Sequence, residues 1–234
     1  MDDDPRSEIV VGLGEYRTNG GWMVVFDDEA TGCALLGWRR PNWPAYNTVD
    51  GQLRPAIGDV DGDGRGEVVL GMGPAASGWL TVMEDWPGGM RRRTGIRVPW
   101  SAYNAANGET WPASGDLDGD GRAEIAVGLG RGGAGQVCLF EDAAAGHAMT
   151  RWVTMPWSLY NANSGDTRPS IGNLDTDTAE DLVVGLGPGG SGYWMMFGNA
   201  TDDFAPRGWR HVPWPAYNSS NGETRPSVGD GAGD

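Results

Sequence analysis

The sequence predicts an all-β fold, and three observations lead to this prediction. A unit of 57 residues repeats along the 234-residue chain, and its most regular landmark recurs at Gly58-Asp59, Gly115-Asp116, Gly172-Asn173 and Gly229-Asp230. Within a unit, short segments rich in β-branched residues alternate with Asp/Gly, Gly/Pro and Asn/Gly clusters, which is typical of strands joined by turns. No segment shows the 3.6-residue apolar period of a helix, so helices are not expected.

The second unit illustrates the strands that we expect. Residues 54–59, 67–71 and 79–83 are predicted as the first three strands, and residues 95–98 as the fourth. The segments between them have the composition of turns, so consecutive strands should run antiparallel. Each unit is therefore predicted to form one four-stranded antiparallel sheet.

Four small sheets repeated around an axis predict a β-propeller with four blades per chain, since radial repetition hides most sheet edges. Residues 1–234 would then be a single domain of four repeats of about 57 residues. The chain begins and ends inside the same acidic loop, so we expect a C-terminal strand, 225–230, to join the N-terminal blade and close the ring. The sequence leaves two assemblies open: a closed four-bladed ring in a monomer, or half of an eight-bladed homodimer.

Charge and composition exclude several classes of partner. The chain has 17 Lys and Arg against 32 Asp and Glu, a net charge of −15. Nucleic acids and anionic membranes require basic patches, so neither is expected as a partner, whereas a cation is. No apolar stretch is long enough for membrane insertion, and the acidic start is unlike a signal peptide. Cys33 and Cys138 lie at different points of the repeat, which favours two buried or half-buried thiols over a disulfide or a zinc site.

The most specific chemical signal is the acidic loop that follows each first strand. In residues 59–67, carboxylates occupy positions 1, 3, 5 and 9, with glycines between them. This pattern can turn several oxygens, together with the backbone carbonyl at position 7, around one hard cation, and calcium suits it better than magnesium. The ligands expected in the first three loops are Asp59, Asp61, Asp63, Arg65 and Glu67; Asp116, Asp118, Asp120, Arg122 and Glu124; and Asn173, Asp175, Asp177, Ala179 and Asp181.

The third and fourth loops depart from this pattern. Threonines replace the glycines of the third loop at 176 and 178. The fourth loop is split between the chain ends, where we expect Asp230, Asp2, Asp4 and Glu8 to contribute. Up to four structural calcium ions would pin the hairpins and couple folding to ion binding. The alternative is that these loops are ordinary Asp-Gly turns on a solvated face.

The loop Gly-Asp-x-Asp-Gly-Asp-Gly-x-x-Glu at 58–67 and the following Val-Val-Leu-Gly-Met-Gly resemble the FG-GAP/VCBS repeats of integrin α-like propellers and their bacterial and lectin relatives. The resemblance implies a β-propeller with calcium in these loops, a binding or adhesion role, and an extracellular or cell-surface location. Two departures matter. Integrin-like rings usually have seven blades where this chain has four units, and the Phe-Gly and Gly-Ala-Pro signatures are altered here.

A second repeated element, Trp-x-x-Tyr-Asn, links each unit to the next on the face opposite the acidic loops. Trp, Tyr, Asn and Arg are the residue types that bind sugars, by stacking and by hydrogen bonding, and several weak sites would gain from multivalency. The candidate ligand-binding residues are Trp43, Tyr46, Asn47, Trp100, Tyr103, Asn104, Trp157, Tyr160, Asn161, Trp214, Tyr217 and Asn218, with Arg54, Arg168 and Arg225. The alternative is structural: Trp and Tyr would pack as wedges between sheets, and Arg would hold carbonyls.

Signatures of catalysis are weak. The two histidines, His147 and His211, occupy different repeat positions, so no His-based triad is supported. The glycine-rich segment 128–133 precedes a predicted strand rather than a helix, which argues against a phosphate loop. We therefore expect a calcium-binding, non-enzymatic recognition module that binds carbohydrate. The alternative is a structural or protein–protein adhesion propeller of a larger surface protein, with a protein ligand.

Overall fold

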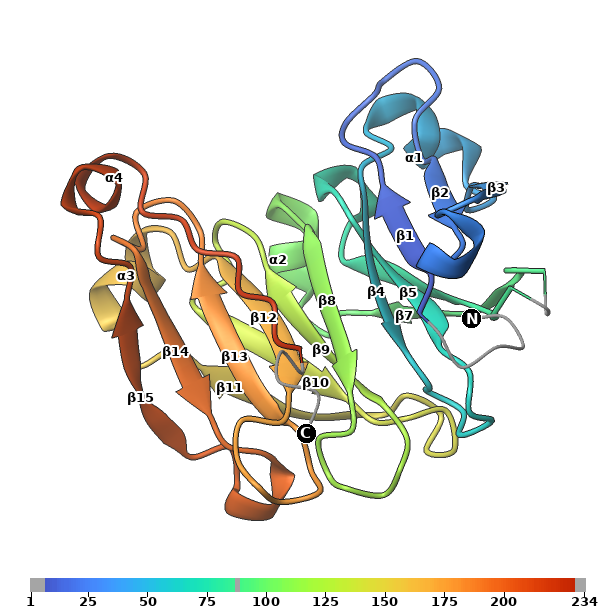
Figure 1. The fold of residues 1–234 in the computed structure, drawn as a ribbon. Coiled ribbons are helices and arrows are strands. Elements are labelled where there is room, and N and C mark those ends of the chain that lie inside the picture. The colour runs from blue at the N-terminus through green and yellow to red at the C-terminus, as the bar shows by residue number, and fades with distance from the viewer. Residues whose placement is uncertain (1–6, 87–88, 230–234) are drawn as a thin grey trace. The chain divides into compact units, whose positions relative to one another are not determined.

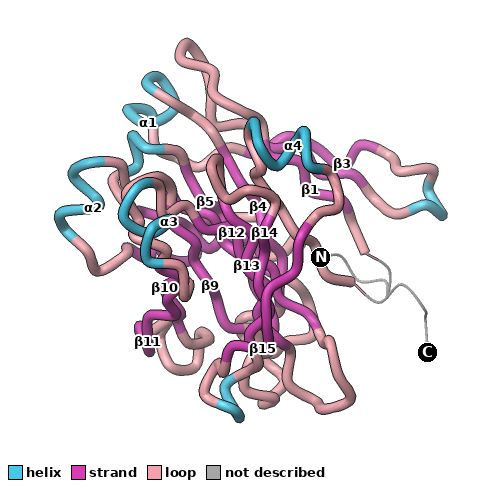
Figure 2. Tube along the Cα trace, turned by 90° about the vertical axis from the view of Figure 1, so that its left-hand side faces the viewer, coloured by secondary structure: helices cyan, strands magenta, loops and turns pink. Residues whose placement is uncertain are grey.

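The computed structural model describes residues 7–86 and 89–229 of the chain. These residues form two compact units, residues 1–59 with 63–110 and residues 60–62 with 111–234, and each unit is described by itself. The regular structure consists mainly of short strands (Figure 2). Within the described ranges, no helix has the length and apolar character needed to cross a lipid bilayer.

The first unit contains two antiparallel sheets (Figure 1). The N-terminal sheet has three strands, β1 (Ile9–Gly12), β2 (Met23–Phe26) and β3 (Leu35–Arg39). The second sheet has four strands in chain order, β4 (Leu53–Gly58), β5 (Glu67–Met72), β6 (Trp79–Met83) and β7 (Arg92–Arg97). The four strands predicted for this repeat are thereby confirmed.

The second unit contains two further four-stranded antiparallel sheets, again in chain order. One consists of β8 (Thr110–Gly115), β9 (Glu124–Leu129), β10 (Gln136–Phe140) and β11 (Met149–Thr154). The other consists of β12 (Thr167–Gly172), β13 (Asp181–Leu186), β14 (Tyr193–Phe197) and β15 (Pro206–His211). These sheets resemble propeller blades, and the all-β fold class is confirmed.

Repeated glycines allow neighbouring sheets to approach closely. A Cβ atom on Gly128 would lie 2.4 Å from the backbone oxygen of Thr167, and one on Gly185 would lie 2.4 Å from that of Thr224. At the first contact, the Leu129 N–H also donates to the Thr167 hydroxyl at 2.9 Å. Glycine is therefore required here by packing against the next repeat, because any side chain would collide with backbone atoms.

The linkers contain short helices that the sequence analysis did not predict. They are α1 (Pro44–Val49), α2 (Ser101–Ala106), α3 (Ser158–Asn163) and α4 (Pro215–Ser220), and single 3-10 turns are present at η1 (Glu29–Thr31), η2 (Pro74–Ala76) and η3 (Ala200–Asp202). Each α-helix has six residues, which is too short to display a 3.6-residue apolar period. The expectation that the chain has no helices was therefore wrong.

Each unit has its own apolar core, built from the inward faces of its sheets. In the first unit the core includes Met23, Val25, Val68, Leu70 and Met83, and in the second it includes Ala126, Val137, Leu139, Val184 and Phe197. Cys138 is buried as expected, but Cys33 is exposed and has a positive φ of 55°, directly after Gly32, the C-cap of η1. The prediction of a buried or half-buried thiol was therefore wrong for Cys33.

The structure has no strand over residues 225–229, and Asp230 lies outside the described residues. This segment begins as the earlier first strands begin, since the Leu186 N–H donates to the Thr224 hydroxyl as Leu129 does to Thr167. Closure of the ring by this segment, the blade count of the assembly and the choice between monomer and homodimer stay predictions.

Candidate functional site

The acidic loop between β8 and β9 gathers three carboxylates. Asp116 follows the end of β8, Glu124 begins β9, and oxygens of Asp116, Asp118 and Glu124 all lie within 4.8 Å of one another. The loop winds around Asp116, whose carboxylate accepts the N–H groups of Gly119 at 2.7 Å and Gly121 at 2.9 Å. Both glycines have positive φ, 80° and 89°, which this tight turn requires.

The electrostatics of this loop favour a bound cation. Glu124 is buried and accepts the N–H of Leu117 at 2.7 Å. Burial, with the carboxylates of Asp118 and Asp116 acting in the same direction, raises the pKa of Glu124 to about 8. A hard divalent cation would compensate these charges, and oxygen donors of this kind are the ligands that calcium prefers. The residues of this loop therefore fit a metal ion.

The first loop repeats the arrangement, with oxygens of Asp59, Asp61 and Glu67 within 4.8 Å of one another. In neither loop does the carboxylate at position 5 join the three others. Asp120 is exposed and pairs with Arg122 at 3.3 Å, and Asp63 accepts the Arg65 N–H at 2.9 Å. The structure thus brings together three of the four predicted side-chain ligands in each loop, and the carbonyl ligands at Arg65 and Arg122 stay predictions.

The third loop is arranged differently, because an arginine side chain reaches its carboxylates. Arg207, on β15, pairs with Asp175, lies 3.5 Å from Asp181 and lies 3.1 Å from Asp202. Hydrogen bonds to Asp175 and Asp202 raise the pKa of the Arg207 guanidinium above its ordinary value. Burial raises the pKa of Asp181, and the charge of Arg207 opposes that rise. The protein itself therefore supplies a cation to this loop.

A buried amide also replaces an acid beside the third loop. Asn199 is fully buried and donates to both carboxylate oxygens of Asp177 at 3.1 Å. The same repeat position beside the second loop is Asp142, which lies 3.6 Å from the Arg122 guanidinium. Within the described part of the chain, the predicted ligands Asn173, Asp175, Asp177, Ala179 and Asp181 include no acidic cluster of the kind found in the first two loops.

The predicted fourth loop falls largely on residues that the structure does not describe. Asp2, Asp4 and Asp230 lie outside the described residues, and Glu8 is buried at the start of the first unit. The split fourth calcium site therefore stays a prediction.

In the linkers, the tyrosine and asparagine side chains hold the backbone. The Tyr103 hydroxyl donates to the carbonyl of Glu109 at 2.6 Å, and the Asn104 side-chain amide donates to the carbonyl of Val98 at 2.7 Å. The same pair of bonds recurs at Tyr46 and Asn47, Tyr160 and Asn161, and Tyr217 and Asn218. Because these polar atoms are occupied in the linker itself, this geometry supports the structural interpretation of the Tyr-Asn pair.

Each linker tryptophan packs on the tyrosine of its own motif. The ring centroids lie 5.3 to 5.6 Å apart in the four pairs Trp43–Tyr46, Trp100–Tyr103, Trp157–Tyr160 and Trp214–Tyr217. The side chain of Trp214 is 62% exposed, whereas the other three are half-buried. The four tryptophans and Tyr217 are thus the aromatic motif residues that remain partly open.

The predicted arginines are held by partners in their own unit. Arg54 pairs with Glu109 and donates to the carbonyl of Met72 at 2.9 Å. Arg168 is buried, lies 3.8 Å from the centroid of the Trp111 ring and lies 3.6 Å from Glu223. Arg225 pairs with the same Glu223 at 2.9 Å. These contacts support the interpretation that the arginines organise the linkers.

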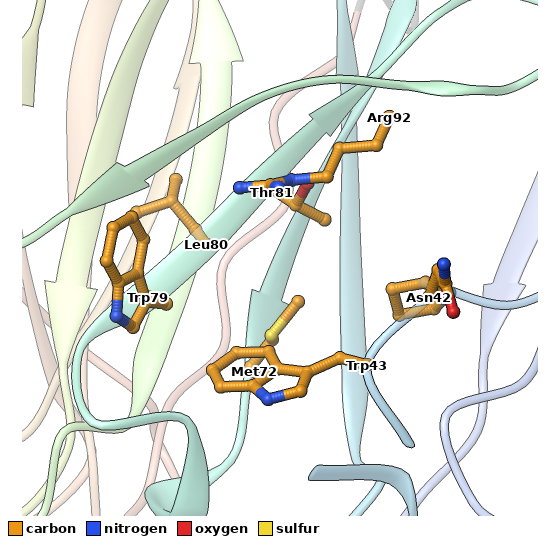
Figure 3. A pocket seen from close by; sticks show the side chains of 8 residues that line it. Asn42, Trp43, Met72, Trp79, Leu80, Thr81 and Arg92 are labelled. Carbon is orange, nitrogen blue, oxygen red and sulfur yellow. The ribbon is translucent and has the colours of Figure 1, made fainter. Parts of the chain in front are cut away.

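The first unit also contains a pocket of about 270 Å³, seen closely in Figure 3. Trp43 and Trp79 stand on two of its sides, and Arg92 reaches across it toward Thr81. The residues that line it are Pro41, Asn42, Trp43, Met72, Trp79, Leu80, Thr81 and Arg92. Of these residues, Trp43 is a predicted ligand-binding residue, whereas Trp79, Asn42 and Arg92 were not predicted as such, and Asn42 and Arg92 do not recur in the repeat.

A second cavity, of about 550 Å³, lies in the second unit along residues 223–229. It has one tryptophan, Trp194, and includes the predicted Arg225 beside Glu223. The lining ends at Gly229, next to residues that the structure does not describe. Only the first pocket combines two indole rings with polar groups among the cavities of the described residues named here.

Comparisons with known proteins bear on the fold. Residues 110–140 match the family model of the FG-GAP repeat, which includes the whole acidic loop 116–124. The chain therefore contains an FG-GAP repeat, and this confirms the resemblance for the third unit. Among curated proteins, none matches the chain.

Two solved structures are similar to the chain. The first is the Dos1 propeller, with a TM-score of 0.49 and 10% identity over 82% of this chain and 42% of that one. The second is the rhamnogalacturonan lyase YesW, with a TM-score of 0.46 and 14% identity over 87% of this chain and 44% of that one. The chain spans less than half the length of either structure.

Proposed function

We propose that this protein is a calcium-stabilised propeller module that recognises carbohydrate and catalyses no reaction. The observation that carries the proposal is the pocket between Trp43 and Trp79. Indole rings stack on the apolar face of a pyranose, and the polar groups of Asn42, Thr81 and Arg92 are suited to its hydroxyl groups. The volume, about 270 Å³, lies near the lower end of the range for ligand pockets, roughly 300 Å³, and suits one or two sugar rings.

The role proposed for the metal is structural. The carboxylates of Asp116, Asp118 and Glu124 would hold one calcium ion, and Asp59, Asp61 and Glu67 would hold another. Each ion would neutralise the clustered carboxylates and fix the hairpin between the first two strands of its sheet, so that ion binding contributes to folding stability.

The lining of the pocket supports recognition rather than catalysis. None of its eight residues is an acid, a histidine or a cysteine. General acid–base catalysis and covalent catalysis need such groups within hydrogen-bonding reach of the substrate. Together with the resemblance to adhesion propellers, this favours a binding module that works outside the cell or at its surface, as a monomeric ring or a homodimer.

The test is a glycan array probed with labelled protein in calcium buffer. We expect selective binding by the native protein, loss of binding in Trp79→Ala, and retention in Trp214→Ala, which removes an exposed indole that does not line the pocket. Circular dichroism must show that both variants are folded. A blank array with folded native protein would overturn the proposal.

The second candidate function is a structural or protein-adhesion propeller. It is favoured by the hydrogen bonds of the Tyr-Asn pairs and by the Trp–Tyr packing, which give most motif residues a structural role. Under this alternative, the native protein would bind a protein partner and no glycan, and Trp79→Ala would leave that binding intact.

A further inference from the structure

We infer that the Trp43–Trp79 pocket takes an acidic saccharide, that Gly95 opens it, and that Arg92 binds the carboxylate of the ligand. This inference rests on the proposed carbohydrate function and narrows it to one ligand class and one sheet. It also replaces four equivalent weak sites by a single site within the sheet β4–β7.

The pocket lies where the second repeat differs from the others at one position of its fourth strand. The fourth strand carries a tryptophan at Trp38, Trp152 and Trp209, and the equivalent residue of the second repeat is Gly95. Gly95 lies in β7, opposite Thr81, as Trp209 lies in β15, opposite Met195. Because this sheet has glycine where the others have tryptophan, its face lacks one indole ring.

The last sheet shows what the missing indole would do. There, Trp209 meets Trp157 edge-on, with centroids 6.1 Å apart, and meets Tyr193 edge-on, with centroids 6.0 Å apart. Trp157 and Tyr193 occupy the same repeat positions as Trp43 and Trp79. In the last sheet, three aromatic rings thus fill the space. In the second sheet, the equivalent space between Trp43 and Trp79 stays open.

Arg92 lies over the glycine that opens the pocket. A Cβ atom on Gly95 would lie 2.2 Å from the Arg92 Nη2 atom and 3.4 Å from the Trp79 ring, so the guanidinium and the indole border the same space. Arg92 is exposed, and no ion pair joins it to an acid among the described residues, whereas Arg93 next to it lies 3.5 Å from Glu84.

These features suit a carboxylate-bearing sugar. A guanidinium binds a carboxylate through two parallel hydrogen bonds, which fixes both position and orientation. No acid lines the pocket, and Arg92 is the charged residue of its lining. The net charge of −15 opposes the approach of an anion, and selectivity must therefore come from the contact with Arg92 rather than from long-range attraction.

The test is calorimetric binding of uronic-acid oligosaccharides and their neutral counterparts to the calcium-loaded protein. We expect tighter binding of the acidic members. Arg92→Gln should weaken binding of the acidic members by roughly 10- to 100-fold, the scale of one charge-assisted pair, and should weaken binding of the neutral members far less, because they lose only a hydrogen bond to a hydroxyl group. Arg93→Gln is the matched control on the next residue and should bind like the native protein.

Gly95→Trp provides a second test, which addresses the open space of the pocket and keeps the Arg92 residue itself. Gly95 is not in the left-handed region, and the nearest atom to an added Cβ is the mobile end of the Arg92 side chain, so the variant should fold. The new indole should close the pocket, abolish saccharide binding and leave the melting temperature unchanged or higher.

The outcomes separate the two proposals. If the folded native protein binds no saccharide, the proposed function fails. If it binds acidic and neutral members equally, and Arg92→Gln changes nothing, only the acidic ligand class is refuted. If binding survives in Gly95→Trp, the assignment of the pocket is refuted.

Discussion

The two asparagines of α3 provide a sharp test of whether the linker motif is structural. Asn161 donates from its side-chain amide to the carbonyl of Met155 at 2.7 Å, and its side-chain oxygen lies against Gly135, 2.0 Å from where a Cβ of that glycine would be. Asn163, on the same helix, is exposed and donates only to the carbonyl of Leu159, one turn earlier. The same substitution to alanine can therefore be compared at both positions.

We expect Asn161→Ala to lower the free energy of unfolding by about 1 kcal/mol, because it removes one of the two hydrogen bonds to the Met155 carbonyl and leaves the one from the Trp157 N–H. For a chain of this size that is a fall in melting temperature of roughly 2–4 °C. Asn163→Ala should stay within about 0.5 kcal/mol, since its bond is local and exposed and alanine favours the helix. Thermal and urea unfolding monitored by circular dichroism measure both.

Equal stability of the two variants would refute the structural role of the motif. Loss of saccharide binding in Asn161→Ala at native stability would restore the motif as a ligand site.

Three further predictions concern the loops and the packing of the sheets. Asp118→Asn should reduce the rise in melting temperature that calcium causes. For the native protein, a calcium concentration 100-fold above Kd should stabilise the folded state by about 2.7 kcal/mol. Equal rises in both proteins would count against the metal site. Arg207→Gln should lower the melting temperature in chelator, because the third loop loses its internal cation. Calcium should restore part of the lost stability by replacing that charge. An unchanged melting temperature in chelator would contradict this role of Arg207. Gly128→Ala should cost about 1–3 kcal/mol or more by urea unfolding, since its Cβ would meet the Thr167 carbonyl, whereas Gly14→Ala, with open space around it, should cost little.

The strands were predictable because each repeats a local pattern of β-branched residues between glycines. β6 (Trp79–Met83) lies where the sequence places it, and β5 differs by one residue. The helices were not predictable in the same way, because a six-residue helix such as α2 has fewer than two turns and no apolar period to detect. Its stability comes from contacts outside the helix, such as that of Tyr103 with Glu109.

The acidic loops were predictable in part. The spacing of Asp116, Asp118 and Glu124 predicts a cluster because all three lie in one loop. The contact of Arg207 with the third loop was not predictable from that loop, since the arginine lies on a strand that is distant in sequence. The local signs were the threonines at 176 and 178 in place of glycines and Asn173 in place of an aspartate.

The pocket was not predicted because it lies where one repeat departs from the others, whereas the candidate ligand-binding residues are ones that recur. Gly95 stands where the other repeats have Trp38, Trp152 and Trp209. A position where one repeat loses a large side chain is the signal that could have located the pocket. In repeat proteins, such exceptions deserve the same scrutiny as the repeated residues.

The measurement that tests the account most directly is a crystal structure of the calcium-loaded protein with an acidic oligosaccharide. We expect an ion held by Asp116, Asp118 and Glu124, a sugar ring between Trp43 and Trp79, and its carboxylate on Arg92. A saccharide bound elsewhere, with this pocket empty, would contradict the account.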